Sequence, residues 1–254
     1  MIDTNSSPSI LDALREDNFT LGNCSVQIYD RKRVDIWGTN YLHHIYGECL
    51  RSRPTHPYGI LPESFCGMTD LSADAICSYL HSRPVLLLLC VHTSAAEFTP
   101  VGFAYPTTFC GAPLNLSAPI PPATTVAERS MFAGYAFFRP WWGKPEIEVL
   151  GMLGLAYFFT RFSLIAVHGM RYPENGLTAH FMQRYGSREV GRIPYYMLND
   201  GKLDSCVVST LLRTDFEQYC RRAILSLAGE TVTNGQGQHH RPSEPGSRTG
   251  DAAE

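Results

Sequence analysis

The feature that most constrains this chain is a strand that runs through a short turn into a long apolar helix. Residues 130–138 read SMFAGYAFF, an apolar run typical of a buried strand. Residues 145–161 read PEIEVLGMLGLAYFFTR, which is enough for about four turns of helix. The helix begins with proline, whose fixed φ suits the first helical position and which has no N–H to leave unsatisfied there. The fold must therefore accommodate a strand–turn–helix unit.

The turn between this strand and helix, residues 139–144 (RPWWGK), has the chemistry of an anion site. Gly143 permits a backbone shape, or a close ligand approach, that a Cβ atom would prevent. The first N–H groups of a helix and its dipole attract anions, and Arg139 and Lys144 add positive charge. Glycine-containing turns of this kind are common, however, and Glu146 is able to cap its own helix. The turn alone therefore does not establish a phosphate-binding site.

The rest of the chain carries strand and helix patterns in an order that indicates the fold class. Residues 85–92 form a continuous apolar run, bounded by Pro84 and Thr93, whose length favours a buried central strand. Further strands are expected at 25–30, 99–107, 164–168, 189–193 and 205–212, and helices at 34–50, 71–83, 174–185 and 215–227. Helical connections separate strands only in the second half. We therefore expect an α+β fold whose sheet is antiparallel at first and parallel near its middle.

Four consecutive segments resemble the conserved half of the GNAT acetyltransferase superfamily. They read GYAFFRPWWGK, PEIEVLGMLGLAYFFTR, SLIAVHGMRYPEN and GLTAHFMQRYGSREVGRIP. The RPWWGK turn resembles a subgroup, several of its members phage-borne, that has Trp-Gly-Lys or Trp-Gly-Arg at this place. Asn175, followed by Gly186, resembles the Asn…Gly spacing of the family. The resemblance covers about residues 85–215.

The resemblance implies a mixed, mostly antiparallel sheet that is splayed near its middle, flanked by helices and able to bind acetyl-CoA in the gap. Backbone groups of Phe137 and Phe138 are then expected to pair with the pantetheine arm as with an added strand. Backbone amides near Trp142, Gly143 and Lys144, with the charge of Arg139, are expected to hold the pyrophosphate. Asn175 is expected to bond the cofactor, while the sequence alone favours it at least equally as an N-cap. These two roles of Asn175 are compatible.

Catalysis in this family is a direct attack of an amine on the thioester, which needs a base and an acid. Glu128, just before the strand, is the first candidate for the base, and Glu97 is the second. Either carboxylate is alternatively a solvated group at the edge of a strand. The family commonly has a tyrosine acid seven residues after the asparagine, where this chain has Met182. Tyr185 lies about one helical turn further on, where it either replaces that acid or packs in the core.

Several other classes of function find little support in the composition. The eight cysteines form no CxxC pair, which favours buried thiols in a reducing compartment. The histidines show no metal-ligand spacing, and His168 and His180, which flank the expected cofactor gap, are interpreted as satisfied core histidines. A net charge of −3 gives no overall basic field that would indicate a nucleic-acid partner. The apolar runs are too short to span a membrane, and the polar N-terminus does not resemble a signal peptide, so a cytoplasmic location is expected.

Two functional hypotheses remain open. The first is an acetyl-CoA-dependent N-acyltransferase that acts on the amine of a small molecule or a protein. The second is a GNAT-shaped binding or structural module without turnover, for example in a phage particle, because Met182 stands in place of the acid. The expected organisation is an N-terminal extension at 1–20, the acyltransferase domain at 21–228 and a disordered tail at 229–254. The oligomeric state is open, with a homodimer as one option.

Overall fold

The computed structural model describes residues 9–30, 32, 73–83, 85–94, 97–107, 130–199 and 202–227. Three sequence expectations lie outside these residues: the helix at 34–50, the candidate base Glu128 and the tail at 229–254.

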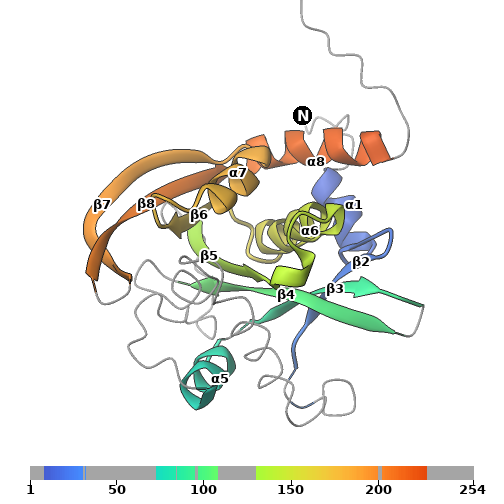
Figure 1. Ribbon diagram of the computed structural model, residues 1–254. Coiled ribbons are helices and arrows are strands. Elements are labelled where there is room, and N and C mark those ends of the chain that lie inside the picture. The colour runs from blue at the N-terminus through green and yellow to red at the C-terminus, as the bar shows by residue number, and fades with distance from the viewer. Residues whose placement is uncertain are drawn as a thin grey trace, which may run out of the picture.

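Eight strands of the described residues form one open sheet in the order β1-β2-β3-β4-β5-β6-β8-β7 (Figure 1). All neighbouring strands are antiparallel except β5 and β6, which are parallel. This arrangement confirms the expected α+β fold with a mixed, mostly antiparallel sheet. The strands are β1 (Thr20–Leu21), β2 (Cys24–Ile28), β3 (Leu87–His92), β4 (Phe98–Thr107), β5 (Ser130–Phe137), β6 (Ala166–Arg171), β7 (Arg188–Asn199) and β8 (Lys202–Leu212).

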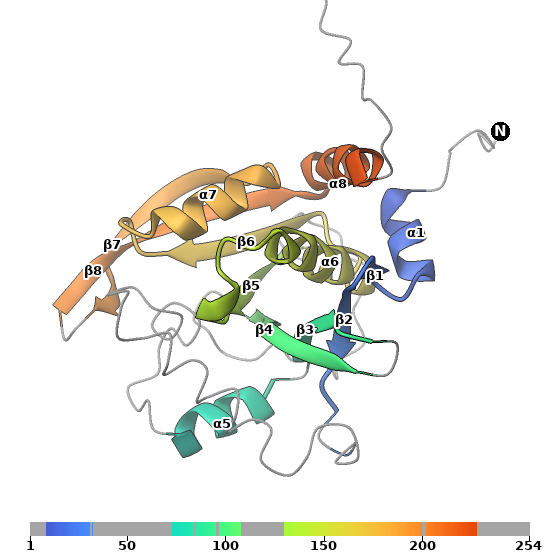
Figure 2. The same cartoon turned by 45° about the vertical axis from the view of Figure 1, so that its right-hand side comes forward.

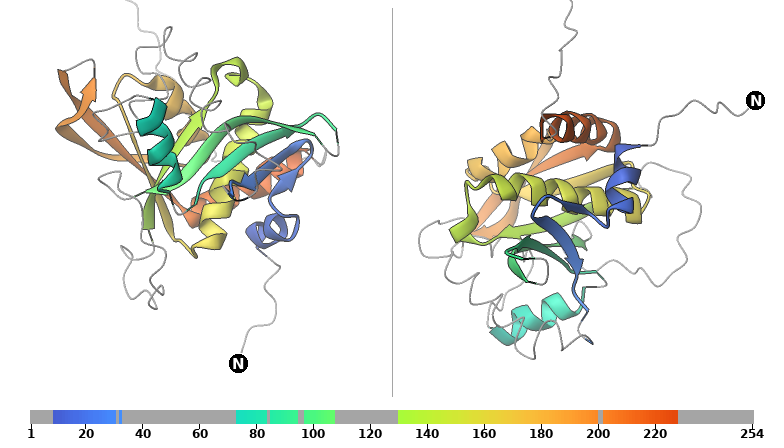
Figure 3. Two further views of the ribbon diagram at one scale, coloured as in Figure 1. Left: turned by 90° about the horizontal axis from the view of Figure 1, so that it is seen from below. Right: turned by 90° about the vertical axis from the view of Figure 1, so that its right-hand side faces the viewer.

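Helices cover both faces of the sheet. Helix α5 lies on one face, and α6 lies on the other together with α1 and α8 (Figures 2 and 3). Helix α6 has the bounds that the sequence predicts, because Pro145 fixes its start. No helix of the described residues combines the length and the apolar character needed to cross a membrane. The helices are α1 (Ile10–Glu16), α5 (Ala73–His81), α6 (Pro145–Arg161), α7 (Gly176–Arg184) and α8 (Arg213–Leu227), with the 3-10 helix η3 at Arg139–Trp141.

The two faces of the sheet carry separate hydrophobic clusters, and β3 serves both. Leu87 and Leu89 pack in the larger cluster beneath α6, whereas Leu88 and Cys90 pack in the cluster beneath α5. A strand that is buried on both faces shows no polar alternation. This is the physical reason for the continuous apolar run that marks β3 in the sequence.

Helix α1 belongs to the larger cluster. Its residues Leu11 and Leu14 are buried there, and the helix contacts α6 and α8. The hydroxyl of Ser9 caps the helix by accepting a hydrogen bond from the N–H of Leu11 at 3.3 Å. Helix α1, which lies within the 1–20 stretch interpreted from the sequence as an extension, therefore packs in the core of the described residues.

The sheet splays open between its two parallel strands. In the described chain, β5 and β6 pair over Ser130↔Ala166, Met131↔Val167 and Phe132↔His168, and no further. Beyond this point β5 stays paired with β4 and β6 stays paired with β8. The expected splay near the middle of the sheet is thus confirmed, and it leaves β5 and β6 unpaired toward the start of α6.

Candidate functional site

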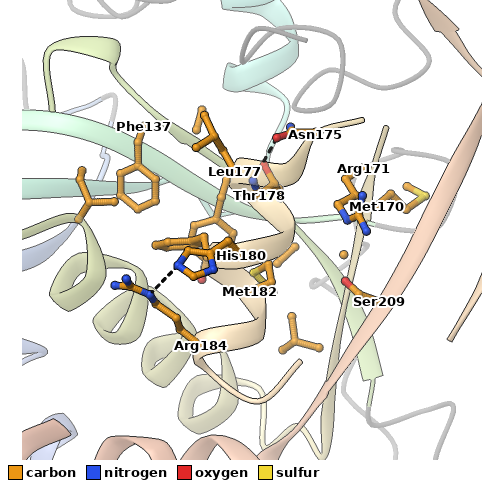
Figure 4. Close-up of a pocket in the computed structure, with 18 of the residues that line it drawn as sticks. Phe137, Met170, Arg171, Asn175, Leu177, Thr178, His180, Met182, Arg184 and Ser209 are labelled. Carbon is orange, nitrogen blue, oxygen red and sulfur yellow. Dashed lines mark hydrogen bonds between the residues drawn. The ribbon is translucent and has the colours of Figure 1, made fainter. Parts of the chain in front are cut away.

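A cavity of about 550 Å³ occupies the gap between β5 and β6. Its walls come from both strands, from the turn before α6 and from α7, the helix at the centre of Figure 4. On the opposite face of the sheet, Tyr79 of α5 and Tyr105 and Thr107 of β4 also line it. The cavity therefore passes through the sheet and connects its two faces.

The turn before α6 and the first residues of that helix bring backbone N–H groups to one end of this cavity, where Gly143 lines it and Glu146 does not. The amides of Trp142 and Lys144 are used within the turn, where they donate to the carbonyls of Arg139 (3.0 Å) and Trp141 (3.1 Å). Within the described part of the chain, the N–H groups of Gly143 and Glu146 make no hydrogen bond. Of the three expected amides, that of Gly143 is thus the one available to an anion.

Gly143 combines a special backbone conformation with open space. Its φ is +79°, in the left-handed region that favours glycine. A Cβ atom at this position would meet nothing within 4 Å, so a ligand can approach the backbone closely. Lys144, the N-cap of α6, is exposed and lines the cavity, and its Nζ lies 4.0 Å from the centroid of the Trp141 ring. Arg139 is exposed at the start of the turn and does not line the cavity.

The edge of β5 directs alternate backbone groups into the gap. The N–H of Phe138 donates to the carbonyl of Val101 at 2.8 Å, so Phe138 belongs to the ladder with β4. Because hydrogen-bonded and non-bonded pairs alternate along an antiparallel ladder, the backbone groups of Ala133, Tyr135 and Phe137 point away from β4 and toward the gap. Phe138 is instead turned away from the cavity, with its ring in the cluster beneath α5.

The indole of Trp142 closes the turn against the strand. Its Nε1–H donates to the carbonyl of Phe137 at 2.7 Å, which takes one gap-facing acceptor of β5. The sequence contains no signal for this bond, because it depends on how the turn folds back over the strand. Trp142 therefore shapes the end of the cavity with its side chain as well as with its backbone.

Asn175 acts as the N-cap of α7. Its Oδ1 accepts a hydrogen bond from the N–H of Thr178 at 3.0 Å, drawn as a dashed line in Figure 4. Only 5% of the residue is exposed, and it lines the cavity. The capping role expected from the sequence is observed, and the side chain is placed where it can also meet a ligand.

No protein-family model matches the chain, and no curated protein resembles it in sequence. Solved structures nevertheless share its fold. RimJ from Mycobacterium smegmatis in complex with CoA-disulfide superposes with a TM-score of 0.53 at 19% identity, over 82% of this chain and 90% of that one. Spermidine N-acetyltransferase from Vibrio cholerae in complex with CoA and spermine gives 0.53 at 14% identity, over 76% and 98%. An acetyltransferase (GNAT family) from Bacillus anthracis gives 0.51 at 12% identity, over 76% and 96%.

The fold is that of the GNAT acetyltransferases. The resemblance seen in the sequence is confirmed at this level, whereas the narrower subgroup with a Trp-Gly-Lys turn stays a prediction. Two of the GNAT-fold structures were obtained with CoA or CoA-disulfide.

The candidate acid of this GNAT fold, Tyr185, points into the core. Its side chain is fully buried, does not line the cavity and donates to the backbone carbonyl of Glu148 at 2.8 Å. Its ring packs edge-on against Phe181 and Tyr219, and burial raises the pKa of Tyr185 well above its ordinary value. The geometry favours the packing alternative. Met182, at the family's tyrosine position, does line the cavity.

Of the two candidate bases, the structure describes only Glu97, and that residue is not at the cavity. Glu97 is exposed in the turn between β3 and β4, where its N–H donates to the hydroxyl of Ser94, and it does not line the cavity. Glu128 lies outside the described residues. His168, interpreted from the sequence as a core histidine, is half-buried and lines the cavity, with its Nδ1 at 2.8 Å from the Oγ1 of Thr210. Burial lowers the pKa of His168 below its ordinary value of 6.5.

A polar network fixes α7 against the rest of the GNAT fold. The carboxylate of Glu148 on α6 accepts a hydrogen bond from the hydroxyl of Tyr219 on α8 at 2.8 Å and forms an ion pair with Arg184 on α7. Arg184 also donates to His180, as Figure 4 shows. Because α7 carries one wall of the cavity, this network holds the wall in place.

Proposed function

We propose that the protein is an acyl-CoA-dependent N-acyltransferase that uses acetyl-CoA as its donor. The observation that carries the proposal is the gap between β5 and β6, which leads to the turn before α6, where the N–H of Gly143 lines the cavity and makes no hydrogen bond within the described residues. A strand-like arm that ends in a diphosphate matches both parts of this arrangement.

The residues present fit acetyl-CoA. The N–H of Gly143 and the ammonium of Lys144, which both line the cavity, suit a diphosphate, and the open space before Gly143 admits it. The exposed Arg139 adds positive charge at the start of the turn, outside the cavity lining. Phe137 and the other gap-facing groups of β5 suit the amides of pantetheine, which then pairs as an added strand. The turn holds its shape through the bond from Trp142 to the strand.

Asn175 contributes at the far side of the gap. While its Oδ1 caps α7, the amide nitrogen of the same side chain is the group proposed to donate to the cofactor. Phe138 supports the site indirectly, because its bond to Val101 fixes which backbone groups of β5 face the gap.

The acceptor amine is proposed to enter from the face that α5 covers, where Tyr79, Tyr105 and Phe132 line the cavity. The reaction forms a bond from the amine nitrogen to the carbonyl carbon and breaks the bond from that carbon to sulfur. The nitrogen loses a proton in the process and the departing sulfur gains one. Glu128 remains a candidate base, whereas Tyr185, buried away from the cavity, is not assigned a part in the chemistry.

Calorimetric titration with acetyl-CoA tests the proposal. We expect saturable binding and about tenfold weaker binding by Lys144→Glu, because a charge opposite to that of the native side chain then faces the diphosphate. Arg15→Glu, on the exposed side of α1, is the matched control and is expected to bind as the native chain does. Absence of binding at millimolar acetyl-CoA would end the proposal.

A CoA-binding module without turnover is the second candidate, favoured by Met182 at the cavity in place of a proton donor. Chromatographic measurement of CoA release from acetyl-CoA, with spermidine, lysine and a peptide with a free N-terminus as acceptors, separates the two. Steady release that depends on an amine supports the transferase, and tight binding without any release supports the module. Chromatography is preferred to a thiol reagent because the chain has eight cysteines of its own.

A further inference from the structure

His168 lies at the closed end of the gap. It forms the last cross-strand pair with Phe132 before β5 and β6 part. Alternation along β6 places its side chain on the face opposite to Val167, which packs beneath α6. That face is the one on which Tyr79 and Tyr105 line the cavity, the side proposed for the acceptor.

The imidazole ring of His168 is held in one orientation. Its Nδ1 lies 2.8 Å from the Oγ1 of Thr210, its cross-strand partner on β8. Its ring centroid lies 5.1 Å from that of Phe132. In the neutral tautomer that carries its proton on Nδ1, this N–H donates to the threonine hydroxyl and Nε2 keeps its lone pair for the cavity.

The length of the gap matches the length of the arm that would fill it. From Phe137, beside the turn, to Phe132, where the strands rejoin, β5 advances by five residues, or roughly 17 Å at about 3.3 Å per residue. About thirteen bonds separate the diphosphate of CoA from its sulfur, which is roughly 15 Å when the chain is extended. A strand added in the gap can extend only until the ladder closes, so the thioester reaches Phe132 and His168.

We propose that His168 is the general base of the acyl transfer, with Thr210 as the residue that positions its ring. This inference rests on the proposed function. Nε2 accepts the proton of the attacking amine while the nitrogen–carbon bond forms, and the imidazolium returns that proton to the departing sulfur as the carbon–sulfur bond breaks. One side chain thus carries out both proton transfers, whereas the side chain of Met182 has no proton to transfer.

The surroundings of His168 favour its neutral form. Burial lowers the pKa of its ring, so the lone pair is present at neutral pH. On the same face the phenols of Tyr79 and Tyr105 share the cavity, and the guanidinium of Arg83 lies behind Tyr79, 3.6 Å from the ring centroid. From the other face Glu148, Arg171 and Arg184 line the cavity.

The first test asks whether bound acetyl-CoA covers His168, and it requires no acceptor amine. Diethyl pyrocarbonate modifies neutral imidazoles, and mass spectrometry of peptides reports the modification of each histidine. Acetyl-CoA is expected to protect His168 by at least fivefold, and adenosine 3′,5′-bisphosphate, which lacks the arm, is expected to leave it reactive. Binding of both compounds without protection by acetyl-CoA would overturn this inference and leave the proposed function intact. Failure of acetyl-CoA to bind would overturn the proposed function instead.

The second test measures the rate of acyl transfer in variants of His168 and Thr210. His168→Gln is expected to lower kcat about 100-fold, with spermidine and with water as acceptors, and to bind acetyl-CoA within twofold of the native chain. His92→Gln is the matched control, because His92 also sits on a strand and bonds a hydroxyl, that of Ser25, but does not line the cavity. Thr210→Val is expected to lower kcat about tenfold with KM unchanged. An unchanged kcat in His168→Gln excludes the role as base.

Discussion

Phe132 on β5 and His168 on β6 form the last pair before the two parallel strands separate, and their ring centroids lie 5.1 Å apart. On one side of this pair the sheet is continuous, and on the other it is open as far as the turn before α6. The pair therefore sets the depth of the cavity, and with it the place where the end of a bound arm would stop.

The stability of the protein should depend on pH through His168. Its pKa is lower in the folded state than the ordinary value of 6.5 because burial disfavours the imidazolium. Below pH 6.5 the unfolded chain protonates this histidine before the folded chain does. The contribution of His168 therefore lowers the stability as the pH falls from 6.5 toward the folded pKa, and it does not change above pH 6.5. We expect urea denaturation at pH 7.5 and pH 5 to show a smaller loss in His168→Gln than in the native chain. Equal losses would show that His168 does not titrate in this way.

The pH dependence of the reaction rate should also reflect the ionisation of His168. With His168 as base, the acid limb of kcat/KM is expected below pH 6.5, because the neutral ring persists to lower pH than that of an ordinary histidine. This limb is expected to disappear in His168→Gln. A limb that persists in the variant would assign the base to another group, such as Glu128.

Gly151 marks the place where α6 and α7 touch. A Cβ atom there would overlap Phe181 and the hydroxyl of Tyr185. Gly151→Ala is expected to lower the free energy of unfolding by about 1–3 kcal/mol through overpacking, and to weaken acetyl-CoA binding because α7 carries Asn175. Gly176→Ala, where a Cβ meets nothing within 4 Å, is the control. Denaturant titration and calorimetry check both, and a Gly151→Ala variant as stable as the control would contradict the contact.

Tyr185→Phe tests the packing role of that tyrosine. Loss of the bond from its hydroxyl to the Glu148 carbonyl is expected to cost about 1 kcal/mol of stability, with kcat within twofold of native. A fall in kcat of a hundredfold or more at unchanged stability would restore Tyr185 as the acid. Thermal unfolding and steady-state kinetics on the same preparation give both readouts.

The two proposed roles of Asn175, as N-cap and as cofactor ligand, can be tested separately. Asn175→Ala removes both the cap and the amide and is expected to destabilise the protein by about 0.5–2 kcal/mol. Asn175→Ser keeps a capping oxygen, so its stability should stay near native while acetyl-CoA binding weakens as much as in the alanine variant. If the serine variant binds as tightly as the native chain, the amide of Asn175 does not contact the cofactor.

The local features of this fold were determined by the sequence alone. Pro145 and the apolar run behind it predict the bounds of α6, the unbroken run at 85–92 predicts a buried central strand, and Asn175 predicts the start of α7. Capping, φ restriction and apolar runs act over a few neighbouring residues, so the linear order contains them. The resemblance of four consecutive segments to the GNAT superfamily also indicated the fold.

The assignment of side chains to the site was decided by the tertiary structure. The bond between Phe138 and Val101 determines which amides of β5 face the gap, and the fold turns Tyr185 inward against α8. His168 meets Thr210 only because β6 pairs with β8, 42 residues further along the chain. Strand register and helix packing are fixed by contacts between distant residues, and a single sequence does not state those contacts.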